Sequence, residues 1–122
     1  MKKASVDLSV SECADHISRS LQEKGFTIFC DVDHQANAHG ADLEMPASRV
    51  LIFGNPAAGT MLMQKDIEVS LDLPLRIAIV QTADGTLVIH NTSDDYRDRY
   101  QLGDHPVLDK IESMYEALVT AI

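Results

Sequence analysis

The hydrophobic positions along this chain change their spacing from one segment to the next, and each spacing predicts one kind of element. Over residues 10–23 apolar side chains recur at helical intervals, with charged and amide side chains on the other side. Ser9 and Glu12 match the capping-box pattern at the start of this helix, and Gly25 matches a left-handed cap at its end. A second helical stripe begins at Pro106, a residue favoured in the first helical turn. An amphipathic helix is therefore expected near each end of the chain.

Alternating apolar and polar residues mark the strands. The predicted strands cover residues 3–8, 26–33, 49–53, 75–82 and 86–92. In the second of them, the side expected to be buried consists of Phe26, Ile28, Cys30 and Val32. The last two strands flank Asp84-Gly85, a pair that favours a hairpin because it adopts left-handed backbone conformations at little cost. These strands are expected to form a mainly antiparallel sheet.

Three shorter helices are predicted around the strands. One covers residues 34–40 and is capped by the residue before it, and another runs from Pro56 to about residue 65. A third is expected after a cap at Ser93, which would place Asp95 and Arg99 one turn apart as an ion pair. Helices and strands thus alternate along most of the chain.

The elements together predict an α+β fold. We expect a two-layer α/β sandwich, with helices packed on a mainly antiparallel sheet of four or five strands. Residues 1–122 are enough for one core, and no repeat or linker divides them, so a single domain is expected. One sheet face of such a sandwich lacks helices, and Phe29, Ala78 and Val80 are expected there. An uncovered apolar face predicts a homodimer.

The charge balance narrows the classes of partner. The chain has 19 acidic and 10 basic residues, and its formal net charge of −9 repels nucleic-acid phosphates and anionic membranes. We therefore expect no nucleic acid and no membrane as a partner. Asp7 and Glu12 interrupt what would otherwise resemble a signal peptide after the N-terminal lysines. A cytoplasmic protein is predicted, although an exported protein without its signal peptide would show the same pattern.

One turn is a candidate binding site. Residues 54–60, with the sequence Gly-Asn-Pro-Ala-Ala-Gly-Thr, join an apolar strand to an apolar helix. Asn55 is a favoured N-cap, and Pro56 suits the first helical position. Amides at the helix start, the Asn55 side chain and the Thr60 hydroxyl can hold a small anionic ligand, and the alternative is a purely structural turn. The lysine of a P-loop is absent after Gly59, which argues against nucleotide hydrolysis.

Several residues also resemble the pattern of a known family. They are Gly25-Phe26, Asp33-His34, Ala36, Ala38, Pro46, Phe53-Gly54-Asn55-Pro56, Gly59-Thr60, Leu62-Met63, Leu73-Pro74-Leu75 and Asp84-Gly85. These residues span about residues 25–100. Their order and spacing resemble those of the bacterial and archaeal family called domain of unknown function 302. The resemblance implies a two-layer α/β sandwich and no established activity. Ala47 and His90 depart from the pattern, in which a hydroxyl residue and an aromatic residue are usual.

Two other groups of residues suggest chemistry. The first consists of Cys30, Asp31, Asp33, His34, His39 and His90, whose side chains are of the types that bind divalent metal ions. Their spacing matches no standard metal motif, and the two cysteines of the chain form no C-x-x-C pair. The second group combines His34 with Asn55 or Asp33 for acid–base catalysis. The simpler interpretation gives Asp33 a capping role, Cys30 a buried position, and His34 a hydrogen bond to the Gly54 turn.

The sequence therefore favours a small binding or accessory module over an enzyme. The pocket is expected between the 54–60 turn and the segment at His34. Its candidate residues are Asp33, His34, Gly54, Asn55, Pro56, Gly59 and Thr60. No nucleophile accompanies them, so no catalytic residue is assigned, and neither a metal ion nor a cofactor is predicted. An enzyme that uses His34 and Asn55, and a metal- or redox-handling protein, are the alternatives.

Overall fold

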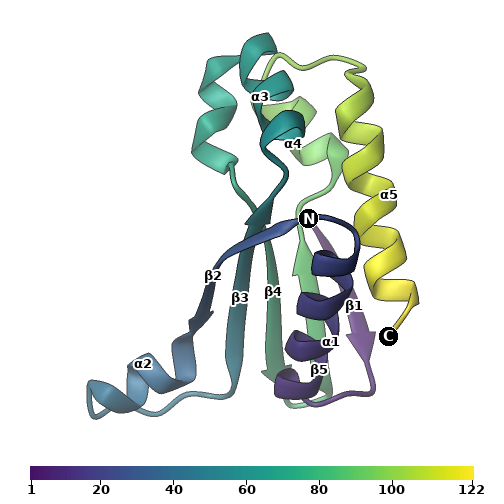
Figure 1. Ribbon diagram of the computed structural model, residues 1–122. Coiled ribbons are helices and arrows are strands. Elements are labelled where there is room, and N and C mark those ends of the chain that lie inside the picture. The colour runs from purple at the N-terminus through teal and green to yellow at the C-terminus, as the bar shows by residue number, and fades with distance from the viewer.

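The computed structural model describes residues 1–122 and contains a five-stranded antiparallel sheet. The strands are β1 (Lys2–Val6), β2 (Thr27–Asp33), β3 (Ser48–Gly54), β4 (Leu75–Thr82) and β5 (Gly85–His90). Their order across the sheet is β1-β5-β4-β3-β2 (Figure 1). Strands β2 to β5 therefore form a meander, and β1 pairs with β5 at one edge of it. The predicted antiparallel sheet is confirmed.

Six helical segments complete the fold. They are α1 (Val10–Glu23), α2 (His34–Gly40), α3 (Pro56–Lys65), the 3-10 helix η1 (Ile67–Asp72), α4 (Ser93–Arg99) and α5 (Pro106–Thr120). Figure 1 shows α1 and α5 alongside the sheet, α3 and α4 beyond one end of it, and α2 at the other end. The predicted α+β class is therefore confirmed. No helix combines the length and the apolar character that a membrane crossing requires.

The core lies between the sheet and the helices α1 and α5. Leu51, Phe53 and Ile77 face it from the central strands and are fully buried. The Phe53 ring meets Phe26 and Tyr115 edge-on, with ring centroids 5.7 and 6.1 Å away. Burial of one such side chain contributes about 1.5–3 kcal/mol, and edge-on aromatic pairs add to that. This aromatic cluster fixes the end of β3 against α5.

The predicted boundaries of the long helices are confirmed. Ser9 Oγ accepts the amide hydrogen of Glu12 at 3.1 Å, and the Ser9 hydroxyl donates to the Glu12 carboxylate at 3.0 Å. Gly25 follows α1 with a φ of +87°, a conformation that strains any residue with a Cβ. Pro106 is the first residue of α5, as its sequence position predicts.

Strand β2 departs from its predicted alternation at Phe29. Ile28 pairs with Phe53 whereas Cys30 pairs with the adjacent Ile52, so Phe29 is the extra residue of a β-bulge. One extra residue turns every following side chain to the other face of the sheet. The prediction that Cys30 is buried is therefore wrong, and its side chain is exposed.

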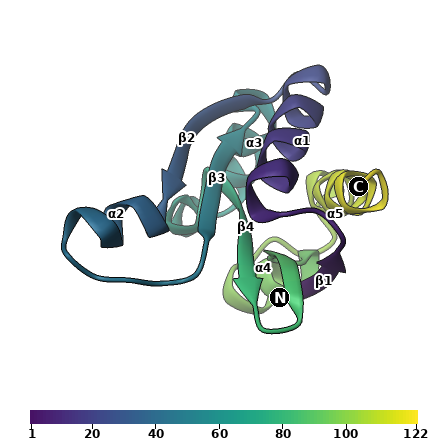
Figure 2. The ribbon, with the colours of Figure 1, turned by 90° about the horizontal axis from the view of Figure 1, so that it is seen from below.

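The face of the sheet opposite α1 and α5 carries no helix (Figure 2). Strand register places on it the half-buried side chains Val32, Val50, Ile52, Ala78, Val80, Leu87 and Ile89, and we call these residues the open face. Ala78 and Val80 thus lie where the sequence predicts. Phe29 lies on the same side at the end of β3, where a Cβ added to Gly54 would come within 3.3 Å of its ring.

Helix α4 corrects two expectations. Thr92, rather than Ser93, is the cap: its hydroxyl accepts the Asp95 amide, and the Asp95 carboxylate accepts the Thr92 amide. Asp95 also pairs with the N-terminal amino group. Arg99 pairs with Asp72 at 3.1 Å. The predicted Asp95–Arg99 ion pair is therefore wrong, because each side chain has a partner outside the helix.

Candidate functional site

The turn at residues 54–60 has the local structure that its sequence predicts. Strand β3 ends at Gly54, Asn55 is the N-cap, and α3 begins at Pro56. Asn55 Oδ1 accepts the amide hydrogens of Ala57 at 3.0 Å and of Ala58 at 3.4 Å. The side chain of Asn55 is therefore a capping group first.

These hydrogen bonds limit what the start of α3 can bind. A helix N-terminus holds anions through amides that have no partner within the helix. Here the Pro56 nitrogen carries no hydrogen, Asn55 occupies the next two amides, and the Gly59 amide donates to the Asn55 carbonyl at 3.0 Å. A small anion would have to displace the Asn55 side chain. The anionic ligand stays a prediction, and the helix-start amides of residues 57–59 do not support it because each already has a partner.

A cavity of about 620 Å³ opens beside this turn. Its volume lies within the ~300–1,000 Å³ that is usual for small-molecule sites. Most of its wall is apolar and includes Phe26, Phe29, Leu62, Met63, Leu73 and Leu75. We call it the α3 cavity. Strands β2, β3 and β4, helices α3 and α5, and η1 with the residues that follow it all contribute to this wall.

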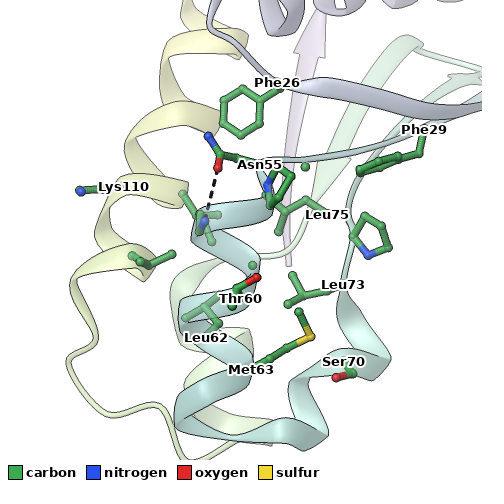
Figure 3. Close-up of a pocket in the computed structure, with 17 residues that line it drawn as sticks. Phe26, Phe29, Asn55, Thr60, Leu62, Met63, Ser70, Leu73, Leu75 and Lys110 are labelled. Atoms are coloured by element: carbon green, nitrogen blue, oxygen red, sulfur yellow. Dashed lines mark hydrogen bonds between the residues drawn. The ribbon is translucent and has the colours of Figure 1, made fainter.

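The polar groups of the α3 cavity are few. Thr60 and Ser70 contribute hydroxyls, Asn55 a carboxamide and Lys110 an ammonium group. Figure 3 shows Thr60 and Ser70 on the side of α3 that faces Leu73, whereas Lys110 lies on the α5 side with its nitrogen directed away from Thr60. An apolar wall with two hydroxyls on one flank suits a mainly apolar molecule with one hydrogen-bonding group.

The structure brings together five of the seven predicted site residues. Those that line the α3 cavity are Gly54, Asn55, Pro56, Gly59 and Thr60. Asp33 and His34 lie elsewhere, because Asp33 pairs with Arg49 at one end of the β2–β3 ladder and Thr27 pairs with Gly54 at the other. The five residue steps from Arg49 to Gly54 correspond to about 16 Å of strand. The predicted pocket between the turn and the His34 segment is therefore wrong.

The separation also removes the expected partner of His34. His34 opens α2 and is exposed, while Asp33 Oδ1 caps that helix by accepting the Ala36 amide at 2.9 Å. Neither the acid–base pair of His34 with Asn55 nor a hydrogen bond from His34 to the Gly54 turn forms. The capping role that the sequence gives to Asp33 is confirmed.

The candidate metal ligands do not converge. The structure contains no group of three or more His, Cys, Asp or Glu side chains that could hold a metal ion. Asp31 instead pairs with Arg49, whose Nε donates to its Oδ1 at 3.0 Å, and this hydrogen bond is the main reason why the pKa of Arg49 is raised. His90 is buried and stacks on Tyr115, with ring centroids 4.1 Å apart, and its Nδ1 donates to the Asn91 carbonyl at 2.8 Å. The family pattern usually has an aromatic residue at this position, and the imidazole ring of His90 stacks there in its place.

Part of the cavity wall was not predicted from the sequence. Phe29, the bulged residue of β2, lines it, and so do Ser70 and Leu73, which belong to or follow η1. Asp66 caps η1 by accepting the Glu68 amide at 3.0 Å. An aspartate directly after a predicted helix is a usable signal for such a second cap.

Comparison with known proteins agrees with the fold. The profile of the family described as Domain of unknown function DUF302 matches residues 1–119. A crystal structure of an uncharacterized conserved protein DUF302 from Bacillus stearothermophilus superimposes with a TM-score of 0.81, covering 98% of this chain and 94% of that chain. The two sequences are 15% identical, so this likeness shows a common fold.

The chain is also similar to one part of longer curated proteins. Fluoride-specific ion channel FluC 1 of Brucella suis biovar 1 (strain 1330) and Fluoride-specific ion channel FluC 2 of Brucella melitensis biotype 1 are each 41% identical to this chain over 68 residues. The match covers 56% of this chain but 27% and 25% of the two channel sequences. The chain therefore matches about a quarter of the length of these relatives.

Proposed function

The chain belongs to the DUF302 family, and we propose that it is a binding module that holds a small, mainly apolar molecule in the α3 cavity. The observation that carries the proposal is the cavity itself, about 620 Å³ with a largely apolar wall. Apolar side chains at its mouth remain open to water, and the Phe29 side chain is 55% exposed. A ligand that covers such surface gains about 25 cal/mol for each Å² removed from water.

The polar groups favour one arrangement of that ligand. Thr60 and Ser70 flank the part of the cavity that Leu73 lines, and each offers a hydroxyl that can donate or accept (Figure 3). An apolar body against Leu73, with one hydroxyl or carbonyl group near Thr60 and Ser70, satisfies both kinds of surface. The ligand class is thus a compact apolar molecule with one neutral hydrogen-bonding group.

An accessory role is consistent with the relatives. In the two Brucella proteins the similar segment is part of a longer chain that is named a fluoride-specific ion channel. A ligand-binding module beside a larger partner can report the presence of its ligand to that partner, without catalysing a reaction itself. The fold alone does not specify such a role, so the proposal rests on the cavity.

A substitution at Gly59 tests the proposal. A Cβ at Gly59 would meet only Leu73 Cδ1, at 3.9 Å, so Gly59→Leu places a side chain in the cavity without displacing backbone. Ala57→Leu is the matched control, because Ala57 is exposed on the same helix and does not line the cavity. The measurement is a fluorescence titration with the uncharged apolar dye N-phenyl-1-naphthylamine, together with the unfolding midpoint of each variant.

The proposal predicts saturable dye binding to the parent chain and to Ala57→Leu, and binding about tenfold weaker in Gly59→Leu, equal to about 1.4 kcal/mol. Equal dye binding in all three chains, with all three folded, would contradict it. Because the open face is a second apolar surface, dye that stays bound to Gly59→Leu would indicate that surface instead.

A further inference from the structure

We propose that the open face is the interface between two copies of this chain. Its apolar residues come from four neighbouring strands, β2, β3, β4 and β5, and no element of the chain covers them (Figure 2). This inference concerns a surface distinct from the α3 cavity and does not depend on the proposed ligand.

The open face lacks acidic residues in a chain whose formal net charge is −9. The polar and charged positions that strand register adds to it are Lys3, Ser5, Thr27, Cys30, Ser48, Arg76 and Thr82. The bulge at Phe29 explains the absence of acidic side chains, because it turns Asp31 and Asp33 to the opposite face of β2. Two copies can therefore bring these faces together without burying like negative charges.

The flat area of the face supplies most, but not all, of the area that a small dimer interface needs. Five strands spaced by ~4.8 Å, with about six residues each at ~3.3 Å, give a surface of roughly 24 by 20 Å, or about 480 Å² before side-chain relief. Stable interfaces bury about 800 Å² of each partner, and small ones bury about 600 Å². Side-chain relief and contact beyond the flat part of the sheet are needed to reach these values.

Residues 34–47, which we call the arm, can supply that contact. The arm contains α2, which buries none of its residues, and Leu43 and Met45 are 64% and 37% exposed. Figure 2 shows α2 projecting from the β2–β3 side of the sheet, away from α1 and α5. A seven-residue helix is not stable by itself in water, so contacts beyond its own caps are expected to hold it. An arm on this side would lie against a second copy docked on the open face.

Sedimentation velocity of the full chain tests this inference, with two matched variants. Val80→Glu introduces a charge in the open face, whereas Ile67→Glu introduces the same charge at a 70% exposed residue of η1, away from both the face and the cavity wall. Circular dichroism establishes that each variant is folded.

The expected result is a particle of twice the 13.4 kDa chain mass at tens of micromolar for the parent chain and for Ile67→Glu. Val80→Glu is expected to weaken dimerisation by about a hundredfold or more, because the glutamate would be buried without a partner. A monomeric parent chain at that concentration, or a folded Val80→Glu variant that dimerises like the parent, would overturn the inference.

Discussion

Asn55 Oδ1 accepts the amide hydrogen of Ala57 at 3.0 Å. The side chain that suggests an anion site in the sequence therefore occupies an amide that an anion would need. The capped helix start then forms a fixed edge of the α3 cavity, with Thr60 one turn further along. The turn that the sequence predicts as an anion-binding site therefore lines a mainly apolar cavity.

Removal of the cap should destabilise the protein. Asn55→Ala deletes the acceptor of two amide hydrogen bonds and is expected to lower the free energy of unfolding by about 1 kcal/mol. Asn55→Asp keeps an acceptor oxygen and is the control, with a loss near zero. Urea unfolding followed by circular dichroism measures both. If Asn55→Ala is as stable as the parent chain, the cap is not what holds the start of α3.

The glycine after α1 should tolerate no Cβ. Gly25 has a φ of +87°, so Gly25→Ala is expected to cost about 1 kcal/mol of stability or more. Gly40→Ala is the matched change, since Gly40 is helical, its φ is ordinary and a Cβ there meets nothing within 4 Å. That variant should be neutral or slightly stabilised. Thermal unfolding measures the stability of both variants. A Gly40→Ala variant less stable than Gly25→Ala would contradict the left-handed conformation at the end of α1.

Asp95 should make part of the stability depend on pH. Its pKa is lowered to about 2, first because it accepts a hydrogen bond from the N-terminal amino group and next because it accepts the Thr92 amide. A carboxyl whose pKa is lower in the folded chain stabilises the fold above its unfolded value, here 3.8, and loses that contribution as pH falls through about 2.

The corresponding experiment compares Asp95→Ala with Asp94→Ala. Asp95→Ala is expected to lose about 1 kcal/mol at neutral pH, and its difference from the parent should shrink between pH 4 and pH 2. Asp94 has a side chain that is 86% exposed, so its replacement should have little effect at any pH. Urea titrations at several pH values give the comparison, and a constant difference for Asp95→Ala would refute the pH dependence.

Asp72 should hold η1 against α4. Its carboxylate accepts the Tyr100 hydroxyl at 2.5 Å and Arg99 at 3.1 Å, and its side chain is 14% exposed. Asp72→Ala leaves both donors without this partner and is expected to cost about 2 kcal/mol, more than Tyr100→Phe, which removes one hydrogen bond. Chemical unfolding measures both losses. A larger cost for Tyr100→Phe would mean that packing around the tyrosine hydroxyl, and not the carboxylate, links these elements.

The fold was predictable from the sequence because its signals are local. Caps at Ser9 and Asn55, proline at position 106 and the Asp84-Gly85 hairpin each act within a few residues, and they place the elements almost as observed. The resemblance to the family pattern pointed to the same sandwich, and the family match over residues 1–119 agrees.

The composition of the site was less predictable because it depends on long-range pairing. The bulge at Phe29 becomes visible only when Ile28 and Cys30 are matched to neighbouring residues of β3. The same ladder separates His34 from Asn55, although a family pattern contains both. The turn at Gly54 was therefore predictable from the sequence, but the segment beside it was not, because no local signal fixes the register of two strands.

The most direct measurement is a methyl NMR titration with benzyl alcohol, a compact apolar molecule with one hydroxyl group. Methyl resonances of Leu62, Met63 and Leu73 report on the α3 cavity, and those of Val50, Val80 and Leu87 report on the open face. The proposed function predicts saturable shifts confined to the first set, which Gly59→Leu abolishes and Ala57→Leu retains. Shifts confined to the open face, or no saturable shift in either set, would contradict it.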